Sequence, residues 1–306
     1  MSEEKLIFLC KDIKQKNDLI TRLNSDCKII DYSEFSHIKN IDIFEAYNAE
    51  NSILCFGMSH LQGMVEQLGG LDKVSVLAAP SMDLYLYRKY LSKIINNTTN
   101  NQRKCVRKIV FELPYYIFNY DLSKTKETAY KRFSYFYNVN DYHNLIKDDK
   151  FTYEIKRIDL VEKIFGKDEI KFSEESEKKS FMWLRKIHGK LDIINGKYSI
   201  WEKNHVETIN ENCRIFADMI EDIKKYFDAE ITLIVMPFNP LFIKTHRKII
   251  KQKKEQFYGI IKKFELTIQD DFNYFSDSRL FVDHCHLNYQ GAYTYKKHID
   301  NKKLFM

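Results

Sequence analysis

Ser59 is the first residue in the sequence whose position predicts chemistry. It lies in residues 53–70, ILCFGMSHLQGMVEQLGG, where a buried apolar run ends at Phe56 and Gly57 permits a tight turn. The apolar spacing that follows predicts a helix ending at Gly69. Ser59 is therefore expected at a strand's carboxyl end and a helix N-terminus, where α/β sheets bind ligands and free N–H groups favour negative charge. A serine there is placed to act as a nucleophile, although serine also commonly caps a helix.

A second reactive segment lies near the other end of the sequence. In RLFVDHCHLNYQGAYTY, residues 279–295, a short apolar run leads to Asp283, and His286 follows three residues later, before an expected last helix over about 288–298. Serine is a poor nucleophile unless an imidazole takes its proton, and that imidazole needs an acceptor on its other nitrogen. Asp283 and His286 supply such a pair locally. The alternative is that both residues only cap or pin the last helix.

The elements that must position these residues follow an alternating pattern. Short apolar runs of strand length occur at residues 6–10, 28–30, 53–56, 74–78, 108–113, 231–236 and 280–282, with helical patterns between them. Helices are expected from Ser81 as N-cap to about residue 95, over 206–227, and over 241–263. This alternation predicts an α/β fold with a central parallel sheet whose strands are buried on both faces.

The alternation is interrupted between about residues 120 and 204. That segment has no strand-like apolar run and is rich in Lys, Tyr, Phe and acidic residues. We interpret 121–204 as a mostly helical cap inserted into one α/β domain that spans 1–306. A cap at this point of the chain connects to sheet elements near the edge from which Ser59 emerges, so it is expected to cover the nucleophile.

Together, the two reactive segments resemble the SGNH or GDSL-like hydrolase superfamily. In that family an early G-x-S block supplies the nucleophile and a terminal D-x-x-H block supplies the acid and base; the matching residues are Gly57 with Ser59, and Asp283 with His286. The resemblance implies a flavodoxin-like three-layer sandwich. It also implies that Ser59 is the nucleophile, His286 the general base and then acid, and Asp283 the carboxylate that orients the imidazole.

The sequence departs from the family pattern at the donors for an oxyanion. The backbone N–H of Ser59 is one expected donor, and Ala79 stands where the family usually has a glycine whose N–H is the second. The family's third block usually ends in an asparagine donor, but residues 111–116 read FELPYY. Tyr115, Tyr116 and Asn119 are the nearby candidates for substrate binding. A missing donor costs on the order of a hundredfold to a thousandfold in turnover.

The second segment also allows two alternatives to the serine triad, a metal site and a cysteine nucleophile. Asp283, His284, Cys285 and His286 all carry ligand atoms, but four consecutive residues do not close one tetrahedral site comfortably, and no second cluster has zinc spacing. We therefore expect no metal. Cys285 as nucleophile is disfavoured because a cysteine next to its base along a strand points away from that base.

Composition and sequence patterns limit the classes of partner and the cellular compartment that we expect for this chain. The net charge of +6 comes from basic and acidic residues scattered along the chain, so no nucleic-acid surface is expected. The N-terminus lacks a secretory pattern, and no run of about 18 apolar residues predicts a membrane span. The six cysteines include no CxxC pair, which fits a reduced, cytoplasmic setting.

The expected function is that of an SGNH-like serine esterase or O-acyltransferase. The resemblance implies an acylated or acyl-accepting substrate of small-molecule or glycan type, with no cofactor unless a transferase uses acyl-CoA as donor. The alternative is a binding or scaffold protein that kept the fold after losing the oxyanion donors. The sequence leaves the oligomeric state open.

Overall fold

A computed structural model of the chain describes residues 7–10, 28–31, 52–78, 81–125, 143–144, 193–194, 199–202 and 204–305. The chain forms two compact units, one of residues 1–42 with 122–183 and the other of residues 43–121 with 184–306. In the first unit, strands β1 (Ile7–Cys10) and β2 (Lys28–Asp31) pair in parallel, and a 3₁₀ turn, η2, spans Leu122–Lys124. Most of the predicted cap, 121–204, lies outside the described residues.

The second unit contains a five-stranded, all-parallel sheet with the order β4-β3-β5-β6-β7. The strands are β3 (Ile53–Gly57), β4 (Val74–Ala78), β5 (Lys108–Glu112), β6 (Glu230–Val235) and β7 (Thr267–Asp270). Counted along the chain within this sheet, the order is the 2-1-3-4-5 of doubly wound, flavodoxin-like folds. The predicted α/β fold with a central parallel sheet is confirmed.

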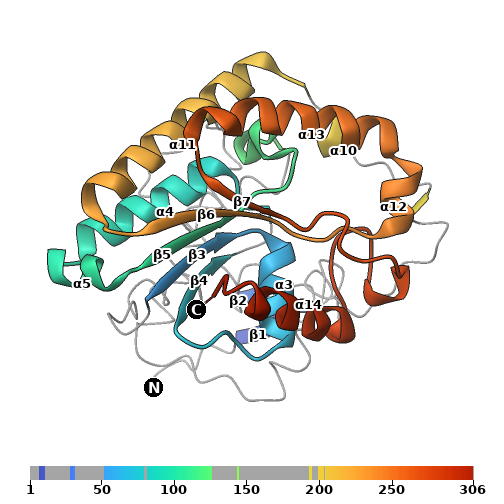
Figure 1. Cartoon of the computed structure of the whole chain (residues 1–306), viewed down its shortest axis with the longest axis horizontal. Coiled ribbons are helices and arrows are strands. Elements are labelled where there is room, and N and C mark those ends of the chain that lie inside the picture. The colour runs from blue at the N-terminus through green and yellow to red at the C-terminus, as the bar shows by residue number, and fades with distance from the viewer. Residues whose placement is uncertain are drawn as a thin grey trace. The chain divides into compact units, whose positions relative to one another are not determined.

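Helices cover both faces of this sheet (Figure 1). Helices α4 (Leu84–Asn97) and α11 (Val206–Tyr226) pack against each other on one face. Helices α3 (Ser59–Gln67) and α14 (Tyr289–Asn301) pack together on the opposite face. The remaining elements are α5 (Asn100–Cys105), η1 (Ile117–Asn119), α10 (Ser199–Glu202), α12 (Pro240–Thr245), α13 (Arg247–Ile261), η3 (Lys262–Phe264) and η4 (Ser278–Leu280).

The central strands are apolar because each is buried on both faces. Every residue of β3 is buried, and β5 is buried from Ile109 to Glu112. A parallel strand covered by helices on both sides reads as a continuous apolar run, which is the pattern that the sequence shows there. Glu112 is the exception, since it is a charged side chain in a run that is otherwise apolar.

Several element boundaries differ from the sequence-based expectations. Helix α4 is capped by Asp83, whose side chain accepts the backbone N–H of Leu86, and Ser81 lies before it with φ of 59°. The expected helix over 241–263 is divided at His246 into α12 and α13. Residues 280–282 form no sheet strand; η4 and an antiparallel bridge between Phe281 and Leu287 stand there instead.

No helix within the described residues combines the length and the apolar composition that crossing a bilayer requires. This agrees with the absence of a long apolar run in the sequence.

Candidate active site

Ser59 is the first residue of helix α3, directly beyond the carboxyl end of β3. The N-cap is Met58, in extended conformation and without a side-chain cap bond, so the alternative that Ser59 caps the helix is wrong. The Ser59 hydroxyl instead lies 2.8 Å from Nε2 of His286. The sheet order reverses between β3 and β5, and open α/β sheets bind ligands beyond the strand ends at this point.

Gly57 allows the chain to turn sharply from β3 into α3. A Cβ at this position would lie 2.5 Å from Cδ2 and 2.8 Å from Cβ of Leu61, which is fully buried in the first turn of α3. The absence of a side chain at Gly57 therefore lets the helix that carries Ser59 begin close against its strand.

Gly57→Ala is expected to move the start of α3 and to lower stability. An overpacked core contact of this kind costs about 1–3 kcal/mol, and the displaced Ser59 would lose its fixed distance to His286. Thermal melting and turnover of a small ester, the activity that the resemblance implies, would check both effects. Gly259→Ala in α13, where a Cβ meets nothing within 4 Å, is the matched control. A Gly57→Ala protein with unchanged melting and turnover would contradict this account of the turn.

Asp283 holds His286 in one orientation. Its Oδ2 lies 2.7 Å from Nδ1 of His286, and its Oδ1 accepts the backbone N–H groups of Cys285 and His286, each at 2.8 Å. Burial alone would raise the pKa of Asp283, but the neighbouring His286 and these hydrogen bonds hold it well below its ordinary value. An ionised carboxylate only accepts, so Nδ1 carries the proton and Nε2 is left to accept the Ser59 hydroxyl.

The loop that carries Asp283 is itself tied down. The side-chain amide of Asn239, the N-cap of α12, donates to the carbonyl of Asp283 at 3.0 Å, and the backbone N–H of Asn239 donates to the carbonyl of His284 at 3.0 Å. The hydroxyl and the imidazole that the resemblance implies as nucleophile and base thus lie within hydrogen-bond distance of each other. The structure brings Ser59, His286 and Asp283 into one hydrogen-bonded chain.

A second histidine and carboxylate lie beside this chain, and the sequence analysis missed their pairing. His60 Nδ1 lies 2.8 Å from Oε1 of Glu112, and Oε2 of Glu112 accepts the backbone N–H of Met58 at 2.5 Å. Both side chains are buried, and the His60 and His286 rings are 5.4 Å apart. The sequence signal that could have indicated this pairing is the acidic residue Glu112, which ends an apolar run in FELPYY.

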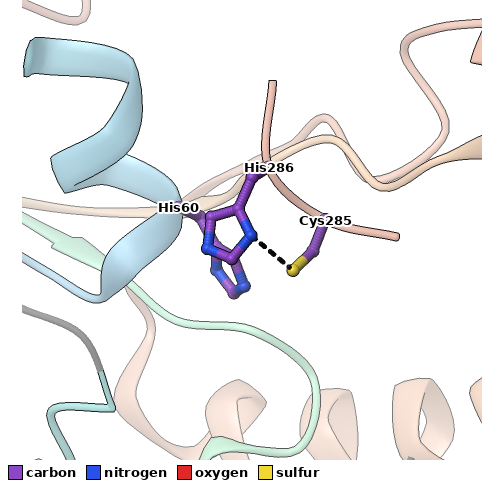
Figure 2. Close-up of side chains that lie close together, drawn as sticks. All are labelled: His60, Cys285 and His286. Atoms are coloured by element: carbon purple, nitrogen blue, oxygen red, sulfur yellow. Dashed lines mark hydrogen bonds between the residues drawn. The ribbon is translucent and has the colours of Figure 1, made fainter. Parts of the chain in front are cut away.

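Cys285 lies against the imidazole of His286, with 3.5 Å between Sγ and Nδ1 (Figure 2). The expectation that Cys285 points away from His286 is therefore wrong, because residues 282–285 form a bend rather than a strand. Burial, and then the charges of Asp283 and Glu112, raise the pKa of the Cys285 thiol well above its ordinary value. A thiol held in its neutral form is a weak nucleophile, because the thiolate is the reactive species. The structure therefore favours Ser59 over Cys285 as the attacking group.

The other predicted site residues have different surroundings. The Tyr115 hydroxyl donates to the Asp270 carboxylate at 2.8 Å, and Asn119 bonds with Gln256 and Lys253 at 2.8 and 3.0 Å, so both polar groups are used in packing. Tyr116 is buried against Trp201, and burial, with Cys285 and Glu112 nearby, raises its hydroxyl pKa well above the ordinary value. Ala79 lies outside the described residues.

Two groups of side chains near the site could hold a metal ion. One consists of His60, Cys285 and His286, and the other of Asp283, His284 and Cys285; within each group the ligand atoms lie within 4.8 Å of one another. The first group was not visible in the sequence, because His60 is distant from the other two residues along the chain.

No family model and no curated protein matches this chain.

Proposed function

We propose that the chain is a serine esterase or O-acyltransferase of SGNH-like type. The observation that carries this proposal is the hydrogen-bonded chain from Ser59 through His286 to Asp283. A hydroxyl, an imidazole and a carboxylate in this order form the arrangement that activates serine for acyl transfer. Its place beyond β3, at the point where the sheet order reverses, adds support.

In this proposal Ser59 Oγ attacks the carbonyl carbon of an ester while Nε2 of His286 takes the hydroxyl proton. The Asp283 carboxylate stabilises the imidazolium that forms. His286 then gives its proton to the leaving alcohol oxygen, and the acyl group remains on Ser59 as an ester. Water or an acceptor alcohol, deprotonated by His286, attacks this acyl-enzyme and returns Ser59 to its starting state.

The first turn of α3 is the proposed binding site for the oxyanion. The first N–H groups of a helix have no acceptor within it, and the helix dipole favours negative charge at that end. The N–H of Ser59 is our first donor, and Ala79 remains a prediction for the second. Of the three side chains considered as further donors, we retain Tyr116, because the Tyr115 hydroxyl donates to Asp270 and the Asn119 amide donates to Gln256.

Water as acceptor would make the protein a hydrolase, whereas an alcohol would make it a transferase that takes its acyl group from a donor such as acyl-CoA. A glycan remains our proposed substrate class on the strength of the resemblance. A binding protein without catalytic activity is the competing proposal, and covalent labelling separates the two.

A fluorophosphonate probe is expected to label the protein once per chain, at Ser59. Ser59→Ala should abolish the labelling, whereas Ser81→Ala, which removes the serine following the neighbouring strand β4, should keep it. Intact-protein mass spectrometry with peptide mapping measures both. A folded wild-type protein that takes up no probe would favour the binding protein.

Asp283→Asn is expected to lower the esterase rate by about 10⁴-fold, because the amide no longer selects the required tautomer of His286. Turnover of a small aryl ester, with thermal melting to verify folding, checks this. Asp277→Asn is the matched control, since the Asp277 carboxylate pairs with Arg279 at the surface. Equal rates in the two variants would argue against a role for Asp283.

A further inference from the structure

Three soft or borderline ligand groups converge beside Ser59. His60 comes from helix α3, and Cys285 and His286 come from the loop before α14; Figure 2 shows the three side chains close together, with the Cys285 thiol directed at the His286 ring. Their ligand atoms all lie within 4.8 Å of one another. Because Zn–S and Zn–N bonds are about 2.3 and 2.0–2.1 Å, tetrahedral sulfur and nitrogen ligands lie about 3.5 Å apart. The Cys285 Sγ to His286 Nδ1 distance is 3.5 Å.

Each histidine of this group is already backed by a carboxylate. Nδ1 of His60 bonds with Glu112 at 2.8 Å, and Nδ1 of His286 bonds with Asp283 at 2.7 Å. Histidines that bind metals usually donate their other ring N–H to a carboxylate or carbonyl, which fixes the ring and increases its basicity. The two carboxylates also supply negative charge around a cation. The surroundings of His60 therefore match those of a metal ligand with Nε2 as the binding atom. On His286 the Cys285 thiol lies on the Nδ1 side, so a metal held there together with Cys285 would replace the bond to Asp283.

We propose that His60, Cys285 and His286 form a binding site for a zinc-type divalent cation, and that a bound cation switches off the Ser59 chemistry. The second half of this inference rests on the proposed function. The serine mechanism uses both nitrogens of His286, Nε2 for Ser59 and Nδ1 for Asp283. A metal on Nε2 displaces the hydroxyl, and a metal on Nδ1 displaces the carboxylate. Either way the imidazole is no longer available as a base.

The donor set also selects the ion. One sulfur and two imidazole nitrogens suit Zn²⁺ and its analogue Co²⁺, whereas Mg²⁺ and Ca²⁺ prefer oxygen ligands. Binding converts the Cys285 thiol into a metal-bound thiolate, and its proton passes to solvent. Neither the metal nor the sulfur changes oxidation state, so a chelator should reverse the effect completely.

Titration of the chelator-treated full chain with Co²⁺ and Zn²⁺ tests the site. We expect one equivalent of Co²⁺ to produce the intense thiolate-to-cobalt absorption band, and Zn²⁺ to displace it. Zn²⁺ should lower turnover of a small aryl ester by about tenfold or more, since it removes the general base, and a chelator should restore the rate. Mg²⁺ at the same concentration should leave the rate unchanged.

Two variants and one control locate the ligands. Cys285→Ser should abolish the cobalt band and weaken zinc inhibition by about tenfold or more. His60→Gln, which keeps a donor near Glu112, should also weaken zinc inhibition. Cys105→Ser, which removes an exposed thiol, should bind and be inhibited like the wild type. A cobalt band that survives in Cys285→Ser, or its absence in the wild type, would overturn the metal site.

Failure of this inference is distinguishable from failure of the proposed function. Fluorophosphonate labelling of Ser59 without a Cys285-dependent cobalt band would leave the hydrolase standing and overturn the metal site. A Cys285-dependent band in a protein without labelling or turnover would support the metal site and overturn the hydrolase. An active enzyme that binds Co²⁺ through Cys285, but keeps its full rate with Zn²⁺ bound, would overturn the switch.

Discussion

Ser59→Ala and His286→Ala are each expected to lower esterase turnover by about 10⁴-fold or more, to the level left by substrate binding and the oxyanion site. Serine supplies the attacking oxygen, and His286 is the group within 2.8 Å that can take its proton. Turnover of a small aryl ester by each variant measures the loss. His205→Ala is the matched control, because His205 is an exposed histidine that precedes α11 and makes no side-chain cap bond.

The double variant separates cooperation from two independent effects. If Ser59 and His286 act as a unit, removing both should be hardly worse than removing either one, because the second substitution affects a step that is already lost. Losses that multiply in the double variant would show that the two residues do not share a step. Melting temperatures near the wild-type value are required in all three variants, since a folding defect would imitate the catalytic loss.

The reactive segments were predictable because their signals are local. The strand, glycine and helix around Ser59 follow from a buried apolar run, a residue without a side chain and helical spacing, all within residues 53–70. Asp283 and His286 bond across only three residues. The distance between these segments does not follow from either one. Their contact was expected from the resemblance to the SGNH-like family and from placing both segments at strand ends, and residues 280–282 in fact form no strand of the sheet.

The residues that sequence analysis missed depend on tertiary pairing. In the sequence, Glu112 is only an acidic residue at the end of an apolar run. Its role as the hydrogen-bond partner of His60 and of the Met58 N–H depends on the tertiary fold. Strand β7, Thr267–Asp270, was missed because it is an edge strand with polar residues and partly exposed side chains. The runs around 6–10 and 28–30 did form strands, yet they pair with each other in a separate two-stranded sheet. The propensity of a segment to form a strand does not determine which other strand it pairs with.

Glu112→Ala is expected to be among the most destabilising single substitutions in the second unit. The Glu112 side chain is fully buried, and its two oxygens bond with His60 and with the backbone N–H of Met58. Removing one partner of a buried pair leaves the other group without compensation, which costs about 3–5 kcal/mol. That is a large share of the roughly 5–15 kcal/mol that holds a typical domain together. A fall in melting temperature on the order of 10 °C is therefore expected.

The source of this loss can be tested by removing both partners of the pair. A Glu112→Gln, His60→Phe protein leaves no buried charge and retains an acceptor for the Met58 N–H, so it should recover much of the stability that Glu112→Ala loses. Glu66→Ala, at a partly exposed position of α3, should change the melting temperature little. If Glu112→Ala melts like Glu66→Ala, the carboxylate does not hold this part of the fold. If it melts early and the double variant does not recover, the loss comes from packing rather than from an unpaired group. Since Met58 directly precedes Ser59, early melting is expected together with reduced esterase turnover, which would link the buried pair to the position of Ser59.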